Sequence, residues 1–195
     1  MIHHTNSFIK RALCFLVIFL FTATAVGFAQ AGKKTVKDQG FSFQHPAAWK
    51  IIDLGGDNYE GTMGYTKALS PPNESNFAMV IMLFPKFALD LESAGLSYPD
   101  FMKMVFENFL AEGEMAGLDI EETDATLQHG TVPAYMVVDD DSEDSFNAAL
   151  ICGDLRNGSA AIIMVSMNIP RDNLENGKAY LDEAEAIMAS FTFPK

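Results

Sequence analysis

Apolar and polar residues alternate along the chain in patterns that predict short strands. Residues 41–44 and 49–54 alternate side chain by side chain, which is typical of strands with one buried face. The glycine-rich segment 55–58 predicts a turn, and residues 59–70 predict a glycine-interrupted strand. Residues 77–84 are apolar throughout, as expected of a central strand that is buried on both faces.

Two segments repeat their apolar residues at helical spacing. In residues 97–117, two apolar stripes at four-residue intervals form one wide face, and Ser97 with Asp100 provides an N-cap signature. Residues 177–190 carry a second apolar stripe. Both segments are therefore predicted to be amphipathic helices.

The second half of the chain predicts two hairpins. Residues 118–128 and 132–141 are joined at His129-Gly130, and residues 146–155 and 159–169 are joined through Asn157-Gly158. An Asn-Gly pair between apolar runs favours a type I′ turn, which needs two residues at positive φ. With two helices among so many hairpins, the pattern indicates an α+β domain, an antiparallel sheet with helices packed on it.

The N-terminus has the pattern of a secretory signal peptide. Lys10 and Arg11 precede the apolar run 12–28, and Ala29-Gln30-Ala31 supplies the small residues that signal peptidase requires. We expect cleavage between Ala31 and Gly32. The alternative is an uncleaved membrane anchor, although the run is slightly shorter than the roughly 20 residues of a membrane span.

Cleavage would leave three parts with different roles. Residues 1–31 are the expected signal peptide, residues 32–39 a short polar tail, and residues 40–195 a single domain. The expected location is the periplasm or the exterior of the cell, with no stable membrane span after cleavage.

Charge narrows the choice of partners. The chain has 13 basic and 26 acidic residues, and its formal net charge is −13. Lys10 and Arg11 leave with the signal peptide, so the mature chain has 11 basic residues against 26 acidic ones, a net charge of −15. Such a surface repels phosphate backbones, which excludes nucleic acid as a partner and favours cationic ones.

Motifs at both ends of the expected domain resemble those of one known family. The sequence GFSFQHPAAWKI (residues 40–51) resembles the strand–proline–tryptophan entry of the Mog1/PsbP-like family. Residues 148–169 resemble the last hairpin of that family, and residues 179–193 its closing helix and Ser-Phe-x-Phe strand. The resemblance implies a Mog1/PsbP-like α+β fold in which Phe41, Trp49 and Phe191 pack in the core.

The same resemblance implies a class of function. The family includes photosystem II extrinsic subunits, a nuclear transport factor and small bacterial envelope proteins, and most members are accessory or binding proteins rather than enzymes. Together with the export pattern, it predicts a non-enzymatic accessory or binding protein of the cell envelope, with an envelope protein or a small ligand as partner. No functional residue carries over, because no binding motif of the family maps onto this sequence.

Few residues are suited to catalysis. The mature chain keeps two histidines, His45 before a proline and His129 at an expected turn, and we interpret both as solvated loop residues. Cys152 lies in an apolar strand and is expected to be a buried, inert thiol. No catalytic residue and no cofactor site is therefore predicted, and a hydrolase remains an alternative only if a pocket holds a carboxylate with a raised pKa.

One segment could bind a metal ion. Asp139, Asp141, Glu143 and Asp144 place hard oxygen ligands within a single loop, as calcium prefers, but the loop lacks the glycine that lets an EF-hand turn sharply. A calcium-binding protein is therefore the main alternative function, against a solvated acidic hairpin end. Thioether ligands would suit a softer metal, but the methionines lie within apolar patterns and are expected to fill the core, including Met79, Met82, Met102 and Met104.

Overall fold

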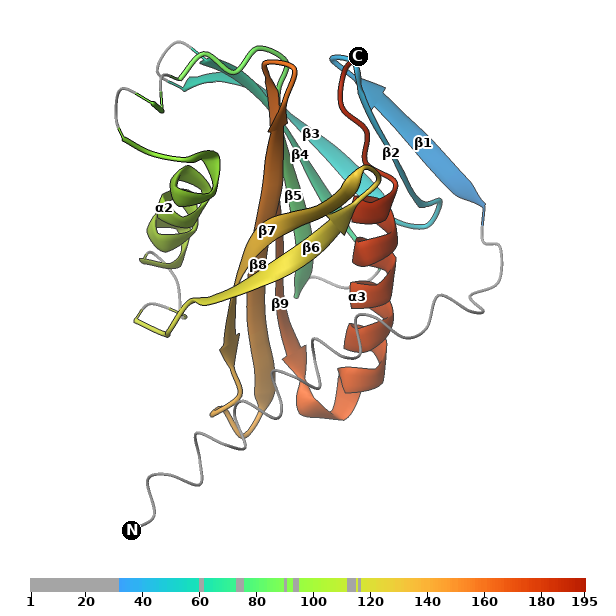
Figure 1. Ribbon diagram of the computed structural model, residues 1–195. Coiled ribbons are helices and arrows are strands. Elements are labelled where there is room, and N and C mark those ends of the chain that lie inside the picture. Colours follow the sequence, from blue (N-terminus) through green and yellow to red (C-terminus); the bar gives the residue numbers. More distant parts are fainter. Residues whose placement is uncertain are drawn as a thin grey trace. The chain divides into compact units, whose positions relative to one another are not determined.

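The described residues form a seven-stranded sheet, a separate two-stranded hairpin and two α-helices (Figure 1). This computed structural model describes residues 32–59, 62–72, 76–89, 91–92, 95–111, 115 and 117–195. Residues 32–195 belong to one compact unit. The expected signal peptide lies outside the described residues.

The sheet is antiparallel throughout and runs in the order β3–β4–β5–β9–β8–β7–β6. The helices are α2 (Tyr98–Ala111) and α3 (Leu174–Ala189), and the short 3-10 helix η1 (Arg171–Asn173) precedes α3. This architecture confirms the predicted α+β class. The strands are β1 (Lys33–Asp38), β2 (Phe41–Pro46), β3 (Lys50–Tyr59), β4 (Thr62–Ser70), β5 (Phe77–Phe84), β6 (Glu121–Leu127), β7 (Gly130–Asp139), β8 (Ser145–Arg156) and β9 (Ser159–Pro170).

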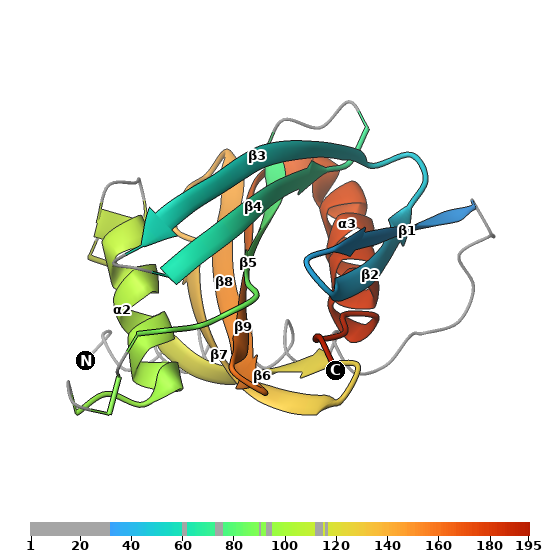
Figure 2. The same ribbon diagram turned by 90° about the horizontal axis from the view of Figure 1, so that it is seen from above.

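The two helices pack on opposite faces of the sheet, and each covers its own apolar core. Figure 2 shows α3 beside strand β2 on one face and α2 on the other. The core under α3 is the larger, and it includes Phe41, Phe43, Leu69, Ile163 and Phe191. The core under α2 is formed mainly with β7, β8 and β9, and it includes Met102, Phe106, Leu110, Ile151 and Ile162.

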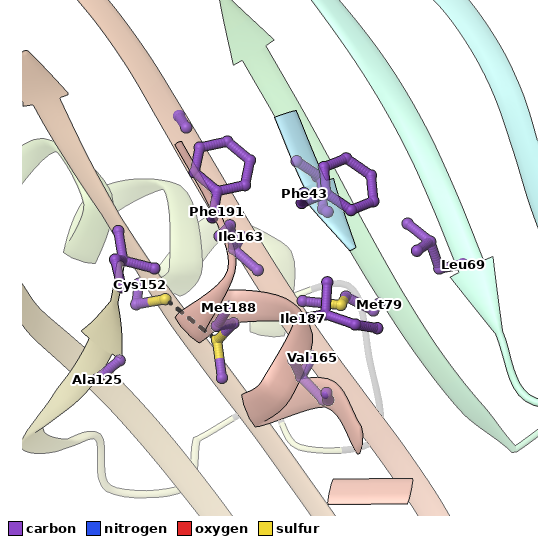
Figure 3. Close-up of a cluster of buried hydrophobic side chains, with 14 of the residues drawn as sticks. Phe43, Leu69, Met79, Ala125, Cys152, Ile163, Val165, Ile187, Met188 and Phe191 are labelled. Atoms are coloured by element: carbon purple, nitrogen blue, oxygen red, sulfur yellow. Dashed lines mark hydrogen bonds between the residues drawn. The ribbon is translucent and has the colours of Figure 1, made fainter. Parts of the chain in front are cut away.

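The two ends of the unit formed by residues 32–195 meet in the larger core, which explains the motifs near both of them. Phe191, just after α3, packs against Phe41 and Phe43 with ring centroids 5.8 and 6.1 Å apart (Figure 3). Trp49 is buried, and its Nε1 donates a hydrogen bond to Glu183 on α3 at 2.5 Å. The predicted core role of these aromatic residues is therefore confirmed.

A buried lysine fastens the β1–β2 hairpin to the main sheet. Lys67 on β4 is only 5% exposed, and its Nζ lies 2.7 Å from a carboxylate oxygen of Asp38 on β1 and 2.9 Å from one of Asp53 on β3. Burial by itself lowers the pKa of Lys67, but the two carboxylates outweigh it and raise that pKa. Lys67 therefore stays charged between its two carboxylate partners.

Several predicted elements are confirmed. β5 has a strand on each side and is the central strand that its apolar run predicts. β8 and β9 form the predicted hairpin, with Asn157 at φ 52° and Gly158 at φ 73°, both in the left-handed region of a type I′ turn. The N-cap of α2 is also present, since the amide of Asp100 donates to Ser97 Oγ and the amide of Ser97 donates to the Asp100 carboxylate.

Three predictions about local structure were wrong. Residues 55–58 form part of β3, where a bulge between Asp53 and Gly55 absorbs the glycines, instead of a turn. The segment 32–39, expected to be a polar tail, contains β1, because its backbone pairs with β2. At the C-terminus, the expected strand is reduced to a single bridge between Thr192 and Ser42.

The apolar face of α2 is narrower than its sequence predicts. Met102, Phe106 and Leu110 are buried, but Phe109 and Met104 are each 42% exposed. Met104 therefore does not fill the core as expected, whereas Met79 and Met102 do. In the second stripe, Phe101 and Val105 pack against this core but are only half-buried, because α2 lies against only part of the sheet.

Gly153 on β8 gives a test of the packing between α2 and the sheet. A Cβ at this position would lie 2.2 Å from the carbonyl oxygen of Ala161 and 3.0 Å from Sδ of Met102. We expect Gly153→Ala to lower the free energy of unfolding by about 3 kcal/mol, because the added methyl overpacks a closed site. The control Gly32→Ala adds a Cβ with nothing within 4 Å. Urea melts that give equal midpoints for both variants would contradict this packing.

Candidate binding surface

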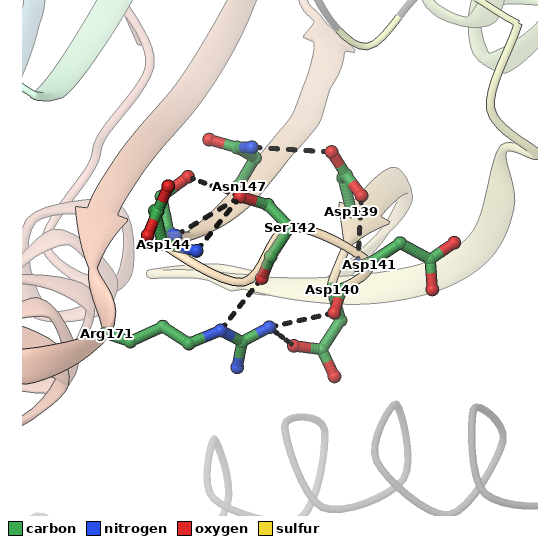
Figure 4. Close-up of polar contacts among 8 residues, drawn as sticks. Asp139, Asp140, Asp141, Ser142, Asp144, Asn147 and Arg171 are labelled. Carbon is green, nitrogen blue, oxygen red and sulfur yellow. Dashed lines mark hydrogen bonds and ion pairs between the residues drawn. The ribbon is translucent and has the colours of Figure 1, made fainter.

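The acidic loop between β7 and β8 is held by an arginine. Arg171, at the start of η1, donates from Nε to the carbonyl oxygen of Ser142 at 2.9 Å (Figure 4). Its Nη2 donates to the carbonyl oxygen and to a carboxylate oxygen of Asp140, at 2.8 and 2.7 Å. The guanidinium therefore already donates hydrogen bonds to two loop carbonyl oxygens, and carbonyl oxygens are groups that calcium uses as ligands.

The predicted calcium ligands do not converge in this loop. One oxygen of Asp139 accepts the amide of Asp141 at 3.1 Å, and the other accepts Nδ2 of Asn147 at 3.4 Å. In Figure 4 the carboxylates of Asp141 and Asp144 point in opposite directions, and Glu143 is exposed. Within the described residues, no group of three or more His, Cys, Asp or Glu side chains could hold a metal ion. Calcium binding through Asp139, Asp141, Glu143 and Asp144 stays a prediction.

The two histidines are not the solvated loop residues that we expected. His45 lies within β2, only 4% exposed, and its Nδ1 has no hydrogen-bond partner among the described residues. Burial lowers its pKa, so the imidazole is neutral. His129 sits at the β6–β7 turn with Nε2 2.8 Å from Asp154 Oδ2, which also accepts Nε of Arg156 at 2.7 Å. Because Arg156 shares this carboxylate, the group is an ion-pair network at the sheet end rather than part of a catalytic triad.

Cys152 is the buried thiol that the sequence predicts. Its side chain is fully buried in β8, and Sγ donates to Sδ of Met188 on α3 at 3.6 Å (Figure 3). Burial raises the pKa of the thiol to about 12, so it stays protonated and unreactive.

One carboxylate has the raised pKa that a hydrolase would require. Partial burial on α3, together with the charge of Asp182 one turn earlier, raises the pKa of Glu185 to about 8. Glu185 is half-buried. The described residues place neither of the two histidines in a hydrogen bond with it. Its perturbed pKa therefore predicts a pH-dependent stability.

The most distinctive surface is the edge strand β3. It pairs with β4 on one side only, and residues 52–58 are all exposed. Ile52 and Leu54 are large apolar side chains, yet 57% and 60% of their surfaces are accessible. Exposed backbone at a sheet edge, beside exposed apolar side chains, is a typical site for pairing with another chain.

This edge continues into an apolar row that crosses the sheet. Ile52 is opposite Ala68, Ala68 is opposite Val80, and Val80 is opposite Met164. Ala68, Val80 and Met164 are only half-buried, and Ile52, Ala68 and Val80 belong to neither core. The row ends at Ile151 and Tyr135 under α2. We call this set the cross-sheet row; α2 covers one end and leaves the end at β3 open.

Comparisons with known proteins give similar folds but no family assignment. No family model and no curated protein sequence matches the chain. The solution structure of cyanobacterial PsbP (CyanoP) from Synechocystis sp. PCC 6803 is similar, with 14% identity over 88% of this chain and 98% of that one, and a TM-score of 0.48. The Ran-binding protein Mog1p of Saccharomyces cerevisiae is similar at 13% identity over 83% of this chain and 95% of that one, with a TM-score of 0.47.

These solved structures are of the two kinds that the sequence motifs resemble. At such low identities and TM-scores they carry no argument about function or partners.

Among the described residues, no helix has the length and apolar character needed to cross a membrane.

The calcium hypothesis can be tested directly by thermal unfolding. If the loop binds calcium, the melting temperature will rise with added calcium, and Asp141→Asn with Asp144→Asn will abolish the rise, because ligands that bind only the folded state stabilise it. The matched control is magnesium at the same concentration. Because Arg171 already holds this loop, we expect no rise in the wild type, and that result would end the hypothesis.

The raised pKa of Glu185 predicts that the free energy of unfolding falls as the pH rises from mildly acidic to mildly alkaline. Its pKa in the folded chain, about 8, lies above the ordinary glutamate pKa of 4.5, so the folded state binds the proton more tightly and stability falls as pH rises through this range. We expect Glu185→Gln to raise the free energy of unfolding at pH near 8 by about 1 kcal/mol, discounted for solvent screening, and to have little effect near pH 4. Denaturant melts of the wild type and of Glu185→Gln, carried out between pH 4 and pH 8, test this prediction. An equal effect at both ends would contradict the assignment.

Proposed function

We propose that this protein is an exported, non-enzymatic binding protein of the cell envelope. Export is supported by Lys10 and Arg11, the apolar run 12–28 and the small residues before Gly32. A binding role is supported by the edge strand β3, which exposes Ile52 and Leu54 beside the open end of the cross-sheet row. That exposure is the single observation that carries the proposal, because a folded chain gains nothing in stability from keeping large apolar side chains in water.

The polar residues support the same class of function. Lys67 pairs with Asp38 and Asp53, and His129, a histidine that sequence analysis considered for catalysis, contacts Asp154. These pairs fasten strands to one another at the ends and sides of the sheet. Side chains engaged in this way hold parts of the sheet together, which supports a binding role.

Charge indicates what kind of partner the protein binds. The mature chain would carry 11 basic and 26 acidic residues, a net charge of −15. At moderate ionic strength such a field attracts cationic partners and repels acidic ones. We therefore propose an envelope protein with a basic, partly apolar surface as partner, ahead of a small ligand.

The experiment is a crosslinked capture of the tagged mature chain from its native envelope, read by mass spectrometry. We expect one stoichiometric protein partner, and a captured chain whose N-terminal residue is Gly32. The control is the same tag on an unrelated exported protein of similar charge. Capture of no partner above this control would overturn the binding proposal, and a captured chain that keeps residues 1–31 would overturn cleavage in favour of an anchor.

A further inference from the structure

The two edges of the main sheet are protected to different degrees. β6 carries Glu121, Glu122 and Asp124 on its exposed positions, and its Ala125 and Leu127 are buried. A row of like charges on an edge strand opposes pairing with a further strand that does not neutralise it. β3, at the other edge, exposes the apolar Ile52 and Leu54 among charges of both signs, Lys50, Asp53 and Asp57.

Part of β3 is closed to a new strand and part is open. The amide of Gly55 donates to the Asp53 carboxylate at 3.0 Å, and the amide of Asn58 donates to the carboxylate of Asp57 at 2.8 Å. The bulge between Asp53 and Gly55 also interrupts the ladder there. The half that begins at Lys50, before the bulge, therefore remains the regular stretch to which an added strand could pair.

The open half adjoins an apolar surface. Ile52 lies at the end of the cross-sheet row, so a strand added beside β3 would place one of its side chains next to Ile52 and in line with Ala68 and Val80. Since alternate side chains of a strand point to the same face, a partner with apolar residues at every second position would extend this row. Main-chain hydrogen bonds would supply affinity, and the apolar positions would supply specificity.

Charge distinguishes between the possible occupants of this edge. A second copy of the chain would bring together two surfaces that each carry a formal net charge of −13, which costs electrostatic free energy. A basic segment is attracted by the same field. This attraction comes from the field of the whole chain, since Asp57 lies beyond the bulge and Asp53 is already paired with Lys67.

We propose that β3 binds an extended segment of a partner protein, with apolar residues alternating with lysine or arginine, as an added strand paired to its first half. This inference rests on the proposed binding function and names the chemistry of the partner. The binding surface consists of β3 before the bulge and the open end of the cross-sheet row, Ile52, Ala68 and Val80.

The probe is a synthetic peptide of about eight residues, the length of a typical strand, with valine alternating with lysine. Amide hydrogen exchange by NMR identifies where it binds, and fluorescence anisotropy gives its affinity. We expect slower exchange along the first half of β3, no protection along β6, and binding that weakens as salt is added. Two control peptides replace lysine by glutamate or carry a methyl group on every backbone nitrogen.

The variants place the same change at each edge of the sheet. Ile52→Lys puts a charge on an exposed residue of β3, and Thr126→Lys does the same on exposed β6. We expect Ile52→Lys to weaken peptide binding by about tenfold or more, since it replaces an apolar contact by a like charge. Thr126→Lys should leave the affinity unchanged, and equal melting temperatures for the two variants would show that both fold.

Four results would overturn the inference: protection of β6 instead of β3, equal binding of the N-methylated peptide, equal binding of the glutamate peptide, or dimerisation of the chain through β3 in sedimentation experiments. The last would make a second copy the occupant. If the envelope capture yields a stoichiometric partner that Ile52→Lys does not release, the protein is a binding protein but β3 is not its site. If the capture yields no partner, the proposed function fails whatever the peptide does.

Discussion

The main sheet has apolar side chains on both faces, and the need to cover both faces organises the rest of the structure. One face is covered in full by α3 together with β2, and this packing brings Phe41 and Phe191 together from opposite ends of the described chain. The other face has only α2, which lies over the end formed mainly by β7, β8 and β9. The half of that face nearest to β3 is therefore left with side chains such as Val80 and Ala68, which are partly exposed and small enough to tolerate water.

Sequence patterns predicted those elements in which the local backbone preference and the packing in the core favour the same residues. One face of β5 lies in the core under α3 and only the end of the other face, at Phe84, lies in the core under α2, and the Asn157-Gly158 pair fits a turn with positive φ. α2 and α3 were predicted from their periodicity for the same reason, since helix formation and burial of a stripe select the same spacing. The motifs at the two ends of the domain were informative because they meet in one core.

Elements that depend on pairing rather than on burial escaped prediction. Residues 55–58 have the composition of a turn, but the same glycines suit a bulge, and only the register with β4 decides between the two. β1 is polar along most of its length and is a strand only because β2 lies beside it. The candidate surface escaped for a related reason: Ile52 and Leu54 look like core residues in a list of apolar positions, and only the strand order places them at an edge.

The electrostatics of the chain fit an edge that is left open to a partner. Two of the few basic residues make contacts within the fold. Lys67 forms an ion pair with Asp38 on β1, and Arg171 donates hydrogen bonds to the acidic loop. The remaining carboxylates leave a strongly acidic field, which by mutual repulsion keeps copies of the chain apart and so limits edge-to-edge aggregation at long range. With that protection supplied by net charge, β3 needs no row of like charges such as the one on β6, and its apolar side chains can stay exposed among charges of both signs. Long-range electrostatic repulsion at this edge acts against acidic chains, including other copies of this protein, but not against a basic chain.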